Sequence, residues 1–193
     1  MINRLLALAG VLAIATPLAI AQTSTWVPDK AHSEVNFSIL HMSLANVRGR
    51  FGGIGGTVAL DQSDITKSTA NITIDVSTVD TGVAARDADL KSPHFFEVAK
   101  YPTATFVSTS FKKNGSDGLI VTGNLTLHGV TRPVVLQAEG PTGPVNGPGN
   151  KQHRGFSATA TLNRKDFGIG PSYPAAAIGD QVKLTIDLDL VKQ

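Results

Sequence analysis

The segment that follows the apolar amino terminus holds the three residue types that serine hydrolases use. Asp29, His32 and either Ser33 or Ser43 would supply the orienting carboxylate, the general base and the nucleophile. Triads are recognised by geometry rather than by nearness in sequence, and these residue types are common. A secreted serine-type hydrolase that uses residues near Asp29 and His32 is therefore kept as the alternative function. The structural alternative is a hydrogen-bonded corner between Asp29 and His32.

The five histidines invite a metal-site interpretation, but their spacing argues against it. His32 and His41 are nine residues apart, so on one uninterrupted strand their side chains would face opposite ways. The sequence has no cysteine, which removes thiolate ligands and a cysteine nucleophile. The nucleophile elbow, the P-loop and the dinucleotide and HExxH motifs are also absent. We therefore expect a protein that is not an enzyme and holds no metal ion.

The composition of the 193-residue chain excludes further classes of protein. With 41% hydrophobic and 17% charged residues, the chain can bury a core and is not disordered. Seventeen Lys and Arg residues against fifteen Asp and Glu residues leave a formal charge of only +2. The basic residues gather no further than pairs such as Lys112-Lys113 and Arg164-Lys165. Nucleic acid is therefore not an expected partner.

The amino terminus has the pattern of a secretory signal peptide. Asn3 and Arg4 precede an apolar run from Leu5 that ends in Ala19-Ile20-Ala21, with small residues where a signal peptidase reads. The run contains a proline and is short for a membrane span, so we do not expect a membrane-integral protein. We predict a cleaved signal peptide at residues 1–21, a single domain at 22–193, and a location in the periplasm or outside the cell.

Alternation of apolar and polar residues dominates the rest of the chain and predicts an antiparallel all-β fold of about eight strands. Turn residues at 114–118 and 128–131 and a Gly/Pro-rich loop at 140–149 separate the strands. One short helix is predicted at Val83–Lys91, and Ser92-Pro93 could begin a second through Ala99. The predicted strands are 35–39, 51–60, 69–76, 103–111, 119–127, 134–138, 156–162 and 182–190.

Eight amphipathic strands favour a closed barrel, because closure removes exposed sheet edges. A barrel of this size is either filled by its own side chains or holds one small ligand. Small residues on the apolar faces, such as Gly123, Ala104 and Ala160, leave room for a ligand. Phenylalanines such as Phe106 and Phe156 would instead fill that room as an ordinary core. The alternation leaves both interpretations open.

Several segments, in order along the whole predicted domain, together resemble the YceI-like family of periplasmic polyisoprenoid-binding proteins. These segments are Asp29 to Ser33, Val35 to Met42, Gly49 to Phe51, Ile74 to Val79, Arg86 to Phe96, Tyr101 to Phe106, Gly123 to Pro133 and Asn163 to Gly168. The resemblance implies a lipocalin-like eight-stranded barrel around an elongated apolar pocket. It also implies a ligand that is a polyisoprenoid, a quinone or another long-chain lipid, and no other cofactor.

On this interpretation the protein sequesters or carries a lipid in the barrel, and a homodimer remains possible. An apolar tube can bind such a chain without any catalytic group, at about 0.8 kcal/mol for each buried CH₂. Arg48, Arg86 and His41 are candidates for contact with a polar head group at the mouth. The residues expected to line the pocket are Phe37, Ile39, Phe51, Ile74, Val76, Leu90, Phe95, Phe96, Phe106, Phe156 and Ala160.

Two of the arginine segments also have a purely structural interpretation. Arg86-Asp87 would then brace the predicted helix against the barrel, and Arg164-Asp166 would clamp a turn. Exposed arginines usually make no specific contribution, so both interpretations are kept.

The signal-peptide prediction has a direct test. Amino-terminal sequencing of exported protein should begin at Gln22, because peptidase reads the small residues Ala19 and Ala21 before the cut. Exported protein that still contains Leu5 to Ala15 would contradict it.

Overall fold

The computed structural model describes residues 23–193, and the predicted signal peptide lies outside them. No helix in this part of the chain is long and apolar enough to cross a bilayer. The strands are β1 (Thr23–Pro28), β2 (Glu34–His41), β3 (Ala45–Phe51), β4 (Ile54–Asp61), β5 (Thr69–Asp75), β6 (Thr103–Asn114), β7 (Gly118–Leu127), β8 (Val130–Glu139), β9 (Val145–Asn146), β10 (Gln152–Asn163) and β11 (Ile178–Lys192). The helix is α1 (Ala84–Lys91), and short 3-10 turns lie at Ile65–Lys67, Val76–Thr78, Pro148–Asn150 and Arg164–Phe167.

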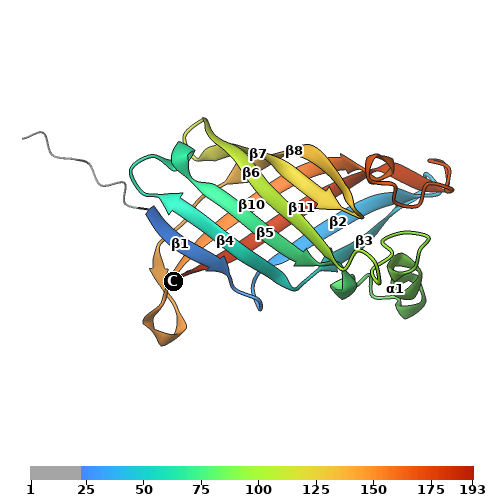
Figure 1. Ribbon diagram of the computed structural model, residues 1–193, viewed down its shortest axis with the longest axis horizontal. Helices are drawn as coiled ribbons and strands as arrows, with labels where there is room; N and C mark the ends of the chain where they lie inside the picture. Colours follow the sequence, from blue (N-terminus) through green and yellow to red (C-terminus); the bar gives the residue numbers. More distant parts are fainter. Residues whose placement is uncertain (1–22) are drawn as a thin grey trace, which may run out of the picture.

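Eight strands close into an antiparallel barrel, as the sequence predicts (Figure 1). The order around the barrel is β1, β4, β5, β6, β7, β8, β10 and β11, and β11 pairs back to β1. The hairpin β2–β3 extends the wall, because β2 pairs with the first part of β11 while β1 pairs with its last residues. The hairpin therefore lies at the same end of the barrel as α1 (Figure 1).

Three strands were not predicted from the sequence: the two-residue strand β9, which lies in the predicted Gly/Pro-rich loop, and the longer strands β1 and β3. In β1 the inward positions are Ser24, Trp26 and Pro28, so only one of them is a large apolar residue. In β3 the glycine at position 49 interrupts the alternation between Val47 and Phe51. Both strands are formed because their neighbours offer paired backbone groups, which hydrophobic periodicity does not report.

The interior is filled at the end away from α1. Trp26 and Leu190 are completely buried there, in a cluster with residues of β4 and β5. The Trp26 indole N–H donates to Ser24 Oγ at 2.7 Å, so its polar group is satisfied. A second cluster includes Phe111 and Val121 in this half of the core and continues to Phe95 and Phe167 at the end nearest to α1. The filled-core interpretation therefore holds for one half of the barrel.

The predicted helix at 83–91 is confirmed, but the predicted second helix through Ala99 is wrong. Residues 92–100 form consecutive turns, in which the Phe96 N–H donates to the Leu90 carbonyl and the Glu97 N–H to that of Ser92. Glu97 has a φ of +46°, which a right-handed helix does not allow. These turns bring Phe95 and Phe96 back towards the barrel.

Hydrogen bonds hold α1 against the barrel through the segment just before it. Arg86 donates from Nε to Thr81 Oγ1 at 2.8 Å and from Nη2 to the Thr81 carbonyl, while Asp87 accepts from the Thr81 N–H. Arg50 of β3 pairs with Asp80 at 3.3 Å. The Gly82 N–H, followed by the Arg50 guanidinium, holds the pKa of Asp80 below its ordinary value. The structure thus supports the bracing interpretation of Arg86 and Asp87.

A buried arginine organises the connection between β10 and β11. Arg164 lies just after β10, is 3% exposed, and donates to the carbonyl oxygens of Ile169, Gly170, Tyr173, Ile178 and Gly179. Its charge is paired with Asp180 at 3.0 Å, rather than with Asp166 as the sequence suggested. Because the guanidinium offers five N–H groups in a fixed plane, one side chain fixes the whole loop 168–180.

Arg164→Lys should therefore lower the free energy of unfolding by about 3 kcal/mol, because an ammonium group cannot reach these carbonyls and leaves them buried and unpaired. Urea denaturation measures the change, and proteolysis should then cut within 168–180. Arg132→Lys is the matched control, since Arg132 is exposed and also donates to this turn, at the Asp166 carbonyl. If Arg164→Lys lowers the free energy of unfolding no more than Arg132→Lys does, Arg164 does not hold this loop.

Candidate functional site

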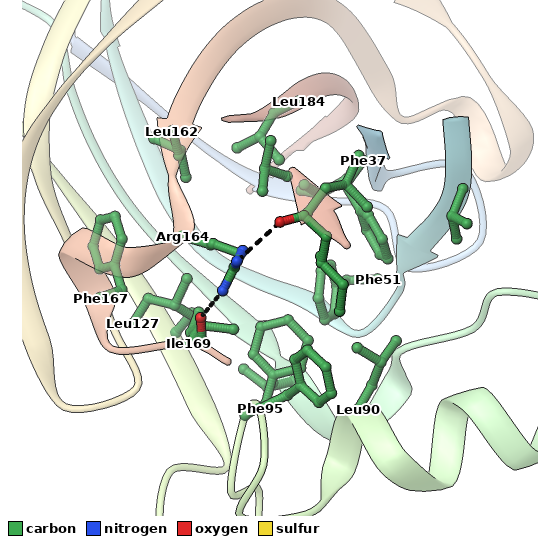
Figure 2. A pocket seen from close by; sticks show the side chains of 18 of the residues that line it. Phe37, Phe51, Leu90, Phe95, Leu127, Leu162, Arg164, Phe167, Ile169 and Leu184 are labelled. Carbon is green, nitrogen blue, oxygen red and sulfur yellow. Dashed lines mark hydrogen bonds between the residues drawn. The ribbon is translucent and has the colours of Figure 1, made fainter. Parts of the chain in front are cut away.

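An apolar cavity of about 280 Å³ occupies the half of the barrel interior nearest to α1. Strand residues form its walls, and α1 with the turns that follow it forms one side of its mouth. Figure 2 shows the labelled side chains pointing into this space from several strands and from α1. The residues that line it are Val35, Phe37, Ile39, Leu40, His41, Val47, Phe51, Ile74, Val76, Arg86, Asp89, Leu90, Phe95, Phe96, Ala104, Leu125, Leu127, Leu162, Arg164, Phe167, Ile169, Ile178, Val182 and Leu184.

Strand register explains why residues far apart in sequence meet in the cavity. Phe37 is paired with Leu184, and Ile39 is paired with both Val47 and Val182. Paired residues on neighbouring strands point to the same side of a sheet. The alternation of β2 therefore places one face of three strands on the cavity.

Aromatic rings form the side of the cavity that lies next to α1. The Phe51 ring lies 5.5 Å from those of Phe37 and Phe96, and the contact with Phe96 is edge-to-face. Phe95 stacks on Tyr173 at 5.2 Å, which joins the turns after α1 to the loop that Arg164 holds. Gly49 makes room for this cluster, because a Cβ there would lie 2.5 Å from Phe37. These ring contacts give the cavity a defined shape rather than a loose interior.

The polar groups at the cavity are few and mostly have partners already. Arg164 is saturated by backbone carbonyls, and two of the Arg86 nitrogens donate to Thr81. Asp89 Oδ1 lies 2.8 Å from His94 Nδ1. His41, at the end of β2, is exposed at the mouth. Among the lining residues that the described part of the chain supplies, none is a serine, threonine or cysteine, so these side chains can contact an apolar chain but include no hydroxyl or thiol nucleophile.

Most of the pocket residues expected from the sequence lie on this cavity. They are Phe37, Ile39, His41, Phe51, Ile74, Val76, Arg86, Leu90, Phe95 and Phe96. The structure places these side chains on the cavity wall, and their contact with a ligand stays a prediction.

Four of the expected residues lie elsewhere. The Phe106 ring covers Gly123 of the neighbouring strand, where a Cβ would lie 2.4 Å from it, so it belongs to the filled core. Phe156 and Ala160 face inward on β10 but pack against the core clusters. Arg48 is exposed, because the inward positions of β3 are the residues on either side of it. Sequence alternation placed these side chains on a face but not along the length of the barrel.

Several lining residues were not predicted from the sequence, although some of them had a signal there. Leu162, Val182 and Leu184 belong to the alternating runs that it identified, so their inward face was known. Asp89 and Arg164 had none, because charged residues give no pattern that marks the wall of an apolar cavity.

The Asp29 segment forms the hydrogen-bonded corner rather than a triad. Asp29 Oδ1 lies 3.0 Å from His32 Nδ1 and accepts from the Ala31 N–H, which is the main cause of its lowered pKa. Ser33 Oγ is buried and both donates to and accepts from the Asp189 backbone, at 3.1 Å each. Ser43 lies in the exposed β2–β3 turn. Among residues 23–193, no group of three or more His, Asp or Glu residues could hold a metal ion.

Comparisons with known proteins agree with this architecture. The family model described as the YceI-like domain matches residues 26–190. Protein YceI of Salmonella newport is 41% identical over 162 residues, which cover 84% of this chain and 83% of that protein. A UPF0312 protein of Vibrio parahaemolyticus is 35% identical over 184 residues, 94% of each chain.

Solved structures show the same fold. The crystal structure of the Campylobacter jejuni YceI protein has a TM-score of 0.71 at 28% identity and covers 80% of this chain and 90% of that one. A domain of Saccharophagus degradans described as polyisoprenoid-binding has a TM-score of 0.66 at 18% identity, covering 89% of this chain and 100% of that one. With a family model that spans nearly all of the described barrel, the chain belongs to the YceI-like family.

Proposed function

We propose that the protein binds a polyisoprenoid, a quinone or another long-chain lipid in the barrel cavity and carries or sequesters it. The observation that carries this proposal is a cavity lined almost entirely by apolar side chains, inside a barrel whose other half is tightly filled. An empty apolar cavity lowers stability, whereas an apolar chain that fills it gains about 0.8 kcal/mol per CH₂. The polyisoprenoid-binding description of the Saccharophagus degradans neighbour supports the same ligand class.

The size of the cavity favours a slender chain over a bulky ligand. Its volume of about 280 Å³ lies just below the range for small-molecule pockets, about 300–1,000 Å³. A few isoprene units would occupy the space between Phe37, Leu90 and Leu162, and a longer chain would extend through the mouth. Arg86, Asp89 and His41 are the polar groups near a head group there.

A carrier needs no reactive group, and the proposal is therefore a binding protein rather than an enzyme. The predicted signal peptide supports a periplasmic location, where a water-insoluble lipid needs a protein to cross an aqueous space. No observation favours the hydrolase alternative, because the hydroxyl of Ser33 is bonded to the backbone.

The first test is the identity of the bound molecule. Protein purified without detergent should carry a long-chain neutral or prenyl lipid near one per chain or per dimer, because the cavity wall is mostly apolar. Native mass spectrometry followed by organic extraction measures it. A protein that is empty and also takes up neither geranylgeraniol nor a quinone in titration would refute the carrier.

The second test fills the cavity. Ala104 lines it from β6, so Ala104→Phe should place a ring in the ligand space and weaken geranylgeraniol binding at least tenfold. The unliganded protein should lose little stability, because the ring enters space that was empty rather than a packed core.

Val107→Phe is the matched control, since Val107 lies on the same strand, is 46% exposed and does not line the cavity. It should leave binding unchanged. Equal binding by Ala104→Phe and wild type, with a large loss of stability, would show that this region is packed core.

A further inference from the structure

Apolar side chains are exposed at the mouth of the cavity. Leu40, Met42 and Leu44, at the end of the β2–β3 hairpin, are 39%, 58% and 82% exposed. Leu40 also lines the cavity, so these side chains continue the apolar wall outward. Exposed apolar groups that form a contiguous patch mark interaction sites more often than scattered ones do.

A second loop extends this patch. The Met42 N–H donates to the carbonyl of half-buried Ala177 at 2.8 Å, which joins the hairpin tip to the exposed residues 174–176. Neither 42–47 nor 171–179 contains a charged residue. We call Leu40, Met42, Leu44 and Pro174–Ala177 the apolar rim. Figure 1 shows both segments at the end of the barrel that carries α1.

The hairpin turn holds one exposed apolar residue, Met42, in an unfavourable backbone conformation. Met42 and Ser43 have φ values of +51° and +56°, and the Leu44 N–H donates to the His41 carbonyl at 3.0 Å. Hairpin turns of this kind favour Asn-Gly, because few other residues adopt a positive φ at low cost. Met42 is exposed and gains little packing in exchange. Strain of this type occurs where a side chain is needed for function.

Unpaired positive charges lie beside the apolar rim. Arg48 and Lys183 are both paired in register with Ser38, on strands that flank it, and both are exposed. No acidic side chain in residues 23–193 forms an ion pair with either of them. Asp80 and Asp180 at this end of the barrel are already paired with Arg50 and Arg164. Arg48 and Lys183 are therefore unpaired positive charges beside the rim, whereas Asp89 at the mouth contacts His94 rather than a lysine or arginine.

We propose that the apolar rim inserts into an anionic phospholipid bilayer, with Arg48 and Lys183 among the head groups, so that the cavity opens directly onto the membrane. This membrane proposal rests on the proposed lipid-carrier function, which gives a reason for the cavity to open onto a bilayer. A narrow, projecting hairpin tip suits a fluid surface, which admits single side chains, and adjacent Lys or Arg residues are attracted to anionic lipids.

The opposite end of the barrel carries charges of both signs. A groove there is lined by Glu139, Asp187 and Asp189 together with Arg154, and the 140–149 loop beside it carries Val145, which is 61% exposed. Val145 therefore supplies a matched exposed apolar residue, far from the rim, for the test.

The test is sedimentation with vesicles, using exported protein whose mass shows that it begins at Gln22. Wild type should bind phosphatidylcholine vesicles that contain phosphatidylglycerol, and added salt should weaken binding. Leu44→Asp should lower binding at least tenfold, and Arg48→Gln with Lys183→Gln should lower it on anionic vesicles alone. Val145→Asp should bind as wild type does. Both Leu44 and Val145 are exposed, so neither substitution should disturb folding, which thermal melting checks.

A fluorescent label tests the depth of insertion. The chain has no cysteine, so Leu44→Cys and Val145→Cys each give one site for an environment-sensitive dye. Dye at position 44 should shift to the blue on these vesicles and be quenched by brominated lipid, while dye at 145 should not respond. An equal response at both positions, or none at 44, would overturn the proposal.

Cavity binding is measured separately with geranylgeraniol delivered from cyclodextrin, and Leu44→Asp should retain it. If the wild-type protein does not bind geranylgeraniol in this assay, the carrier function is refuted. Intact cavity binding without vesicle binding would overturn the membrane proposal alone. Sedimentation velocity tests whether the rim is instead a contact between two copies of this chain. Self-association of wild type that Leu44→Asp removes, without vesicle binding, would support that contact and overturn the membrane proposal.

Discussion

The long pairing between β10 and β11 is the constraint on which the rest of the structure depends. It runs without a break from His153 opposite Val191 to Asn163 opposite Gln181, and it closes the barrel. Because β11 also pairs with β1 at one end and with β2 at the other, it supports both the filled half and the cavity half. The loop that joins β10 to β11 lies at the cavity end of the barrel, where Ile169 lines the cavity, and Arg164 fixes it there.

The two halves of the interior differ in how their aromatic side chains are used. At the filled end, the Phe106 ring covers the gap beside Gly123, and Trp26 is completely buried. At the cavity end, Phe37 and Phe51 contact each other along the wall instead of crossing the interior. A small residue on an inward face therefore does not predict a cavity, because a neighbouring ring can fill the space that it leaves.

The sequence predicted the barrel because alternation reports which side of a strand is apolar. It predicted much of the cavity wall for the same reason, as Phe37 and Ile39 show. Alternation carries no information on position along the barrel axis, so Phe156 was grouped with residues of the other half. Alternation likewise gives no information on Arg164, because the role of this side chain depends on five backbone carbonyls that only the folded loop brings together.

The division of the barrel also explains how it can hold a cavity without losing its fold. An empty cavity lowers the free energy of unfolding in proportion to its volume. Here the cavity wall is held by strand pairing and by the loop that Arg164 fixes. The filled half supplies burial that needs no ligand. On the proposed function, a bound lipid would add stability by mass action, in proportion to the logarithm of its concentration over its dissociation constant. Trp26 and Leu190 do not line the cavity, so the burial that they supply is independent of a ligand, whereas Arg164 belongs to both the fold and the cavity wall.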